Sequence, residues 1–143
     1  MPEATQDKLR LTLRSRHASL TRRRLEVFKA FGGHTPLSMN QLVKLLPDMD
    51  RATVYRTTKL FEELGIIDRV LLGWKYKLEL SDSFSPHHHH LSCNNCGRVN
   101  ILAEDNQLEA YIKSLSHRAG FQAIDHQLEI NGLCPACQKL SKV

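Results

Sequence analysis

Two Cys-x-x-Cys pairs constrain this chain more than any other feature of its sequence. Cys93 and Cys96 form the first pair, and Cys134 and Cys137 form the second. Zn²⁺ prefers four tetrahedral ligands, and two such turns supply four thiolates to one ion. The long segment between the pairs must then fold so that its two ends meet. We expect the four cysteines to hold a structural zinc ion that stabilises a small domain directly.

A redox role for the second pair is the alternative interpretation. The segment Cys134-Pro135-Ala136-Cys137 has the spacing of a thioredoxin-like motif. We expect neither a strand before it nor a helix after it, and a second pair is present, so metal binding is favoured. No residue pattern resembles an activated nucleophile with its base, and a four-thiolate site has no open position for catalysis. An enzyme is therefore not expected, and no small organic substrate is predicted.

Four consecutive histidines, His87 to His90, precede the first cysteine pair. On a strand, His88 and His90 face one side while His87 and His89 face the other, so one strand can serve two metal sites. His126 falls within an apolar alternation, where an ordinary core histidine bonded to a backbone carbonyl is the competing explanation. Imidazole and carboxylate ligands suit Zn²⁺, Fe²⁺, Mn²⁺ or Co²⁺ without identifying the metal.

The net charge of +5 is placed unevenly along the 143 residues. Residues 1–83 carry 15 Lys and Arg against 10 Asp and Glu, whereas residues 84–143 carry 5 of each kind. A basic excess in one half favours a nucleic-acid partner, because positive side chains displace phosphate counterions. Basic surfaces also occur without such a partner, so the charge alone does not decide the question.

The first half has the pattern of a winged helix-turn-helix domain. Helices are expected from Thr21 to Gly32, from Ser38 to Pro47 and from Asp50 to Gly65. Two strands follow at residues 66–72 and 75–80, joined by a turn at Gly73-Trp74. In this architecture the third helix enters the major groove of DNA.

The exposed face of the third expected helix carries a polar stripe. Arg51, Tyr55 and Lys59 recur every four residues and therefore project together, with Thr53 and Arg56 beside them. Such side chains reach phosphates or base edges in a DNA complex. An ordinary solvated helix face would have the same pattern.

The second half is expected to form a separate α/β domain. Strands at residues 87–92 and 98–102 precede a helix at 105–117 and a strand at 121–130, in which Ile124, His126 and Ile130 share one face. Small and polar residues at 81–86 predict a hinge. The predicted fold is α+β, with domains at residues 1–83 and 87–143. The chain has no apolar run of membrane-spanning length and a polar N-terminus, so we expect a cytoplasmic protein without membrane contact.

These motifs together resemble the ferric uptake regulator family of metal-dependent bacterial repressors. The resemblance is carried by Asp50-Arg51-Ala52-Thr53-Val54-Tyr55-Arg56, by His87 to Gly97 and by the late Cys134-x-x-Cys137, and it extends from about Arg14 to Cys137. It implies a homodimer with an N-terminal winged-helix DNA-binding domain and a C-terminal α/β dimerisation domain.

The resemblance also implies three metal sites. The four cysteines correspond to the structural zinc ligands. Glu79, His88 and His90 correspond to a regulatory site at the hinge, and His34 is offered as its fourth ligand, although Pro36 stands at the direct match. His87, His89, Glu109 and His126 correspond to a further site in the dimerisation domain. His89 stands where many members have Asp, an exchange that favours zinc or cobalt.

For DNA, the resemblance points to the recognition helix and to the start of the first expected helix. The residues so assigned are Arg51, Thr53, Tyr55 and Arg56, with Thr21, Arg22 and Arg23 near the backbone and Arg14 or Arg16 at a minor groove.

The sequence therefore predicts a metal-responsive transcriptional repressor that binds a pseudo-palindromic operator as a homodimer. Its expected cofactors are structural Zn²⁺ and a regulatory divalent ion, with zinc first because of the histidine run and iron or manganese next. Three alternatives remain: a zinc storage or delivery protein, a thiol oxidoreductase, and a peroxide-sensing member of the family. Peroxide-sensing members use an acidic residue where this chain has Ile101.

Overall fold

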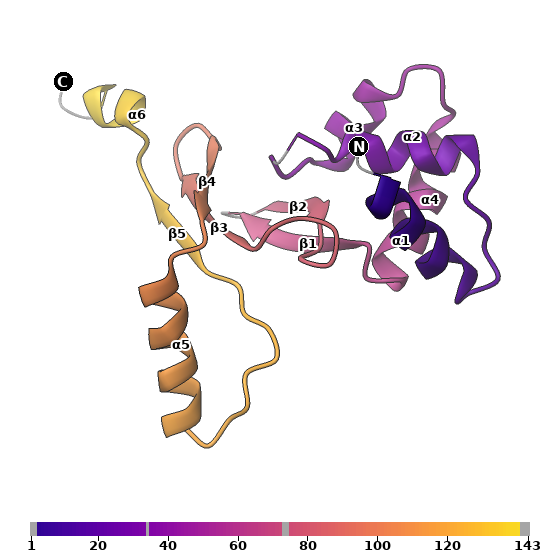
Figure 1. The fold of residues 1–143 in the computed structure, drawn as a ribbon. Helices are drawn as coiled ribbons and strands as arrows, with labels where there is room; N and C mark the ends of the chain where they lie inside the picture. Colours follow the sequence, from indigo (N-terminus) through magenta and orange to yellow (C-terminus); the bar gives the residue numbers. More distant parts are fainter. Residues whose placement is uncertain (1–2, 34, 73–74, 141–143) are drawn as a thin grey trace. The chain divides into compact units, whose positions relative to one another are not determined.

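The computed structural model describes residues 3–33, 35–72 and 75–140. Its chain divides into two compact units, Met1–Pro86 and His87–Val143. Helices and sheets occur in both units, so the α+β prediction is confirmed (Figure 1). The expected turn at Gly73-Trp74 lies outside the described residues. No helix among the described residues has the length and apolar character needed to cross a bilayer.

The first unit contains four helices followed by a β-hairpin. These are α1 (Glu3–Arg14), α2 (Arg22–Ala30), α3 (Met39–Leu45), α4 (Arg51–Glu63), β1 (Ile67–Leu72) and β2 (Lys75–Leu80). The hairpin strands are antiparallel, with Ile67 opposite Leu80 and Leu72 opposite Lys75. A bridge between Leu37 and Leu78 ties the segment before α3 to the hairpin.

Side-chain caps fix where three of these helices begin. Thr21 accepts a hydrogen bond from the backbone of Arg24, and Ser38 forms a capping box with Gln41. Asp50 accepts a hydrogen bond from the Thr53 backbone N–H over 2.8 Å and so begins α4. These caps satisfy backbone donors that would otherwise lack partners in the first turn.

The core of the first unit is aromatic and aliphatic. Phe28 of α2 packs edge to face on Phe61 of α4, with ring centroids 6.4 Å apart, and on Phe84, 5.6 Å away. Leu9 and Leu13 of α1 are fully buried in the same core. No helix was expected before Thr21. The spacing of Leu9 and Leu13 by four residues is the signal for α1.

The segment expected to be a hinge begins as an ordered turn. The Ser81 hydroxyl donates to the carbonyl of Gly65 over 2.7 Å, and the backbone N–H of Phe84 donates to the carbonyl of Ser81 over 2.7 Å. The Lys8 ammonium of α1 lies 5.2 Å from the centroid of the Phe84 ring. Residues 81–84 therefore belong to the packed first unit.

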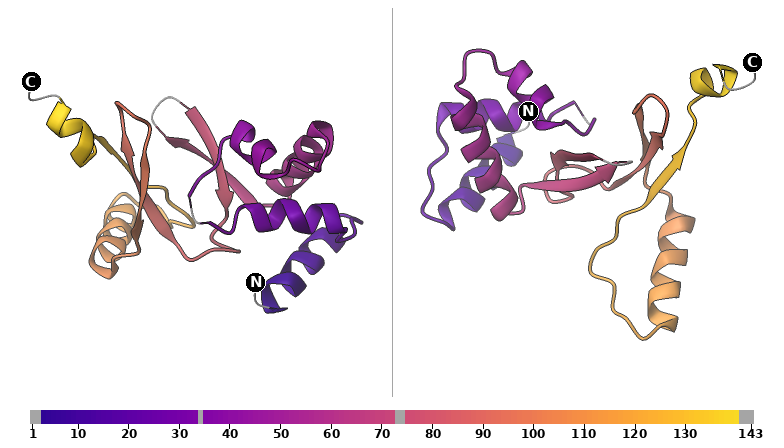
Figure 2. Two further views of the ribbon diagram at one scale, coloured as in Figure 1. Left: turned by 90° about the horizontal axis from the view of Figure 1, so that it is seen from above. Right: turned by 180° about the vertical axis from the view of Figure 1, so that it is seen from behind.

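The second unit is built around the strand that carries the histidine run. Strand β3 (His88–Cys93) lies between β4 (Val99–Ala103), which is antiparallel to it, and β5 (Glu129–Gly132), which is parallel. Helix α5 (Asn106–Arg118) is capped by Asp105 and connects β4 to the segment that leads to β5, and α6 (Pro135–Leu140) follows β5 (Figure 2).

The prediction of a strand at residues 121–130 is wrong over most of that segment. Only Glu129 and Ile130 belong to β5, which pairs from Glu129 opposite His90. In this register the residues before His126 lie beyond the start of β3, and none of the described strands pairs with them. Ile124 is consequently 97% exposed, and the expected apolar face does not form. The same segment leads back from the end of α5 to β5 as a coil.

Candidate metal centres and nucleic-acid interface

The four cysteines converge from two ends of the second unit. Cys93 ends β3, Cys96 follows in a turn, and Cys134 and Cys137 lie at the start of α6. Their Sγ atoms all lie within 4.8 Å of one another, and none of the four cysteines takes part in a disulfide. Gly97 closes the first turn with a positive φ of 70°, a conformation that glycine adopts at little cost. The arrangement supplies four soft ligands to one point, as tetrahedral Zn²⁺ requires.

Hydrogen bonds and burial give these thiols different pKa values. The backbone N–H of Cys134, 3.3 Å from Cys93 Sγ, is the main cause that lowers the pKa of Cys93 to about 6. The backbone N–H of Cys137 lowers the pKa of Cys134. Asn95 acts to lower the pKa of Cys137, but hydrogen bonds with Cys134 and burial outweigh it and raise the value to about 12. Such uneven pKa values fit clustered thiols, because neighbouring negative charges repel unless a cation lies between them.

The surroundings of the second pair differ from expectation. Strand β5 precedes Cys134 and α6 begins at Pro135, so the prediction that this motif lacks a neighbouring strand and helix is wrong. The thioredoxin-like spacing still does not describe an isolated dithiol, because Cys96 Sγ lies 3.7 Å from Cys134 Sγ. The four-thiol grouping favours metal binding over dithiol chemistry.

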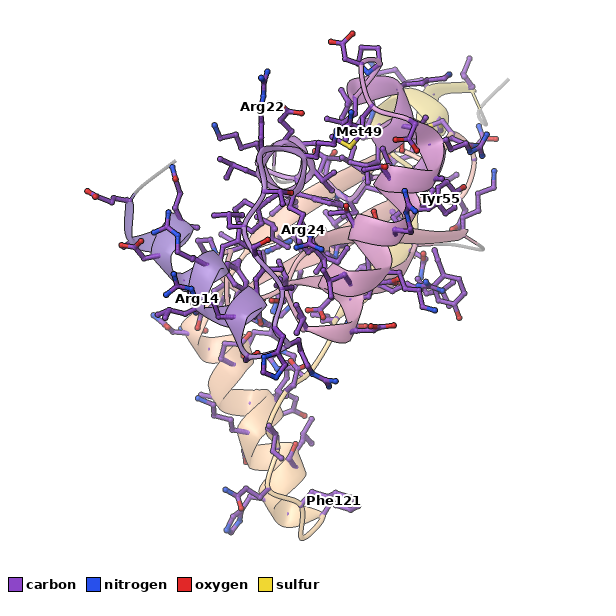
Figure 3. All side chains as sticks on the ribbon, turned by 90° about the vertical axis from the view of Figure 1, so that its right-hand side faces the viewer. Arg14, Arg22, Arg24, Met49, Tyr55 and Phe121 are labelled. Carbon is purple, nitrogen blue, oxygen red and sulfur yellow. The ribbon has the colours of Figure 1, made fainter. Side chains whose placement is uncertain are left out.

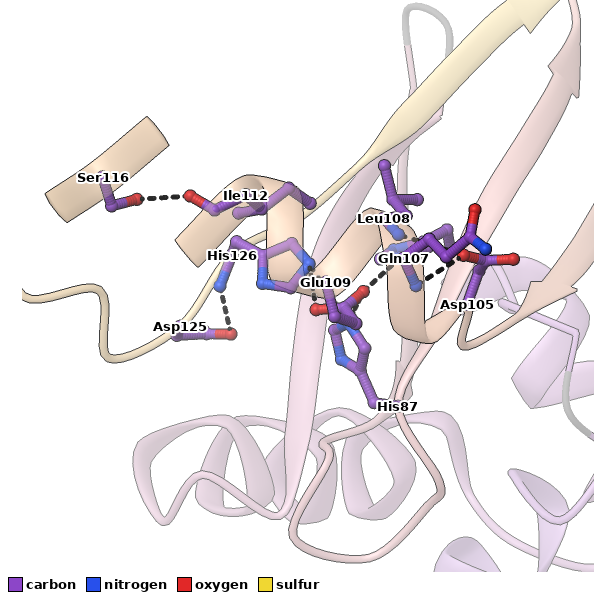
Figure 4. Close-up of polar contacts among 10 residues, drawn as sticks. His87, Asp105, Gln107, Leu108, Glu109, Ile112, Ser116, Asp125 and His126 are labelled. Carbon is purple, nitrogen blue, oxygen red and sulfur yellow. Dashed lines mark hydrogen bonds and ion pairs between the residues drawn. The ribbon is translucent and has the colours of Figure 1, made fainter. Parts of the chain in front are cut away.

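A second cluster joins two histidines of the run to α5. Nε2 of His89 lies 2.9 Å from Oε1 of Glu109, and Nε2 of His126 lies 3.3 Å from the other carboxylate oxygen. Nε2 of His87 lies 3.7 Å from Glu109 and 3.3 Å from Nε2 of His126. Glu109 thus lies between His126 and His87 (Figure 4).

The chemistry of this second cluster fits a divalent ion. Burial disfavours ionisation of Glu109, but the hydrogen bond from His89 and the charges of His126, His87 and His89 outweigh it and lower the pKa of the carboxyl. Nε2 of His87 and Nε2 of His126 are 3.3 Å apart, and between two neutral rings they can form at most one hydrogen bond. Both nitrogens can instead bind the same cation. Among the described side chains, the buried Nδ1 of His89 has no hydrogen-bond partner, although Nε2 of the same ring is bonded to Glu109.

The remaining histidines of the run lie together on the other face of β3. The rings of His88 and His90 are 4.9 Å apart between centroids. Glu79 belongs to β2 of the first unit, and His34 lies outside the described residues. The hinge site of Glu79, His88, His90 and His34 therefore stays a prediction.

The polar stripe of the recognition helix is exposed on α4. Tyr55 is 42% exposed, and its hydroxyl accepts a hydrogen bond from Arg51 Nη2 over 3.3 Å. Arg51 Nη2 also lies 3.4 Å from Oδ1 of Asn40 on α3, a partner that the sequence analysis missed. Arg56 donates to the hydroxyl of Thr53 over 3.2 Å. The stripe is thus preorganised by contacts within the first unit.

The residues assigned to the DNA backbone lie at the start of α2. Arg22 is 92% exposed and pairs with Glu26 over 2.9 Å, and it extends away from the helix (Figure 3). Arg23 pairs with Asp50, the cap of α4, over 3.3 Å. Thr21 caps α2, Arg14 ends α1, and Arg16 follows it. Whether these residues contact DNA stays a prediction.

Comparisons with known proteins agree on one family. A sequence model described as the Ferric uptake regulator family matches residues 16–131. A ferric uptake regulation protein of Synechococcus elongatus is 32% identical over 143 residues, which cover 94% of this chain and 96% of that protein. The ferric uptake regulator of Helicobacter pylori, whose likeness shows the fold alone, has a TM-score of 0.78 at 20% identity and covers 95% of this chain and 93% of its own. A zinc uptake regulator in complex with zinc and DNA has a TM-score of 0.61 at 25% identity, covering 99% of this chain and all of its own.

Proposed function

The chain belongs to the ferric uptake regulator family of metal-responsive transcriptional repressors, and we propose how its own residues carry out that function. The observation that carries the proposal is the alternation of β3. Its histidines separate onto two faces, one of which meets Glu109 and His126, and the strand ends at Cys93 of the thiol cluster. One short element therefore links metal ligands with different roles.

We assign the structural zinc ion to Cys93, Cys96, Cys134 and Cys137. A bound Zn²⁺ supplies a cross-link between the end of β3 and the start of α6. His87, His89, Glu109 and His126 form the additional site of the second unit. The family's regulatory ion, zinc, iron or manganese, is assigned to Glu79, His88 and His90, with His34 as a further candidate. The similar zinc uptake regulator and the replacement of Asp by His89 support zinc first.

The two units take different parts of the function. Residues 1–83 bind the operator through α4, residues 87–143 form the homodimer, and the segment around residues 81–86 connects them. Glu79 and His88 lie on opposite sides of this connection, so ligation by both selects one orientation of the DNA-binding unit. In the dimer, two copies of α4 then reach successive major-groove faces of a pseudo-palindromic operator. DNA must tighten metal binding by the same factor as metal tightens DNA binding.

The proposed role is regulatory and not catalytic. The family's members are transcription regulators. Its operator partner implies a cytoplasmic location. A peroxide-sensing role finds less support, because Ile101 stands at the position of the acidic residue that such members use, although peroxide-responsive repressors are among the relatives.

Metal analysis joined to operator binding tests the proposal. Tag-free protein should hold one tight zinc per chain after mild chelation, and return of a second metal should restore specific retention of an AT-rich pseudo-palindromic duplex. His88→Ala and His90→Ala should abolish the metal dependence while zinc content stays unchanged. His117→Ala, an exposed histidine of α5 outside both clusters, is the matched control. Retained zinc without any metal-dependent retention would favour the storage alternative.

A further inference from the structure

A groove on the first unit lies between α4 and the β-hairpin. Its volume is about 540 Å³, and its floor includes the buried side chains of Thr58 and Leu78. Lys59 and Glu62 of α4 line one wall, and Arg69 of β1 with Tyr76 of β2 lines the other. Tyr55 and Arg56 also line it, so the groove is continuous with the surface assigned to base recognition.

The groove has an excess of positive charge. Arg56, Lys59 and Arg69 line it, and Glu62 is the one carboxylate among the lining residues of this part of the chain. Oε1 of Glu62 accepts a hydrogen bond from Nε of Arg69 over 2.9 Å and forms an ion pair with its Nη2 over 2.8 Å. Arg69 therefore balances this carboxylate, and Arg56 and Lys59 leave the groove with a net positive charge that suits an anionic ligand. Lys59 Nζ lies 4.0 Å from Oε1 of Glu63, a pair between two exposed side chains that contributes little.

Arg69 and Tyr76 are held in place for such a ligand. The Arg69 guanidinium lies over the Tyr76 ring, 5.8 Å from its centroid, and its Nε is bound by Glu62. Tyr76 is nevertheless 62% exposed, and its phenol is a hydrogen-bond donor. The contacts of Arg69 with Glu62 and with the Tyr76 ring already restrict its side chain. Less rotamer entropy is therefore lost when the remaining nitrogen, Nη1, binds an anion.

The geometry of duplex DNA identifies the ligand. A major groove is about 12 Å wide and an α-helix with its side chains about 10–12 Å, so a helix that lies in it has a sugar–phosphate backbone on each side. The hairpin covers one side of α4. A backbone on that side must pass the cations of the groove.

We propose that this groove binds one sugar–phosphate backbone of the operator, with Arg69 Nη1 and Lys59 contacting a phosphate and Tyr76 donating its hydroxyl to a phosphate oxygen. The inference rests on the proposed function, because it needs α4 in the major groove. The hairpin would then contact DNA. Its contacts would fix the position of the protein on the duplex without reading the base sequence.

Salt-dependent binding by the metal-loaded full chain tests this assignment. Affinity for an operator and for a scrambled duplex is measured by fluorescence anisotropy at several salt concentrations. Arg69→Ala should weaken binding to both duplexes by the same factor, roughly tenfold, as expected for a lost charged hydrogen bond. The slope of log affinity against log salt should fall by about one for each chain. Tyr76→Phe should weaken both duplexes less and leave the slope unchanged.

Two further variants separate contact from net charge and folding. Lys29→Ala removes an exposed charge of α2 outside the groove and should leave the slope unchanged. Arg69→Lys keeps the charge and should retain the slope, but it should weaken both duplexes equally because an ammonium cannot reproduce the guanidinium fork. This loss of affinity carries the test if Arg69→Ala lowers the melting temperature. Phosphate-ethylation interference should lose one position per half-site in Arg69→Ala.

The outcomes distinguish this proposal from the function on which it rests. Wild-type protein without metal-dependent operator binding would overturn the proposed function. Normal wild-type binding with unchanged affinity in Arg69→Ala and Tyr76→Phe, and an unchanged slope in Arg69→Ala, would overturn the groove assignment alone. A loss confined to the operator, with scrambled DNA unaffected, would also overturn it, because Arg69 would then read bases.

Discussion

At the scale of single residues, the four thiols to which we assign zinc differ in their pKa values. Cys93, with a pKa of about 6, is a thiolate at neutral pH, whereas Cys137, with a pKa of about 12, is protonated. Zinc needs thiolates, so its binding displaces the Cys137 proton. The sequence cannot show this division, because it arises from the backbone N–H of Cys134 and from the packing of Cys137.

We predict that the zinc affinity of this site depends on pH in two regimes. Affinity should fall as pH falls at all values, because protons compete with zinc. Below about pH 6, Cys93 also takes up a proton, and the fall of log affinity with each pH unit should become steeper by about one. Competition with a chelating indicator between about pH 5 and about pH 8 measures this dependence. A constant slope through pH 6 would contradict the assignment of the low pKa to a zinc ligand.

A second residue-scale prediction concerns the stripe of α4. Arg56→Ala should weaken operator affinity by about 1–3 kcal/mol if its guanidinium reads a base edge. Tyr55→Phe removes the hydroxyl that accepts from Arg51 over 3.3 Å, and the loss should be smaller. Neither change should alter metal content. Gel-shift titrations against the operator and a base-substituted duplex measure the effect, and Lys44→Ala on α3 is the charge control. Unchanged operator affinity would show that this face of α4 is an ordinary solvated surface that does not contact DNA.

At the scale of elements, α1 contributes to the core of the DNA-binding unit. Leu13 is fully buried, and a large-to-small substitution in a packed core costs about 2–5 kcal/mol. We therefore expect Leu13→Ala to lower the free energy of unfolding by this amount in urea denaturation. Leu11→Ala, at a side chain that is 66% exposed, should change it by less than about 0.5 kcal/mol. Equal effects of the two substitutions would show that α1 does not pack as described.

Elements with local signals could be predicted from the sequence. Caps at Thr21, Ser38 and Asp50 marked α2, α3 and α4, because side-chain capping is decided by neighbouring residues. The prediction of a strand at residues 121–130 failed because pairing depends on where β3 begins, which is not a local property. Helix α1 was missed because Leu11, which is exposed, interrupts the apolar spacing of Leu9 and Leu13, and burial on a distant core decides its place.

The candidate metal sites could be predicted in part for the same reason. Alternation on a strand is local, so it separated His87 and His89 from His88 and His90. The meeting of His126 with Glu109 depends on the return of the chain after α5, and only the family resemblance indicated it. Asn95, whose side chain bonds Cys137, was missed, although its place between Cys93 and Cys96 was a signal.

At the scale of the whole molecule, the second unit has little apolar core of its own. Among its described residues, the buried hydrophobic side chains are Cys93 and Cys137. Tyr111 and Leu115 of α5 are 59% and 42% exposed, and Ile130 of β5 is 47% exposed. Phe121, beyond the end of α5, is 73% exposed (Figure 3). Small units of this kind need a metal or a partner subunit to be stable.

We predict that Tyr111→Glu separates the homodimer into monomers. A charge at the centre of an apolar contact costs desolvation without a partner, so association should weaken by more than tenfold. Sedimentation velocity should then show a monomer at micromolar concentration. The melting temperature of the wild type should rise with protein concentration, because dimerisation stabilises the folded chain by mass action, and that of the variant should not. Lys113→Glu changes the charge of α5 by more, but on the opposite side of the helix from Tyr111, and should leave the dimer intact. A Tyr111→Glu protein that stays dimeric would place the subunit contact elsewhere and leave the exposed apolar side chains of α5 without this explanation.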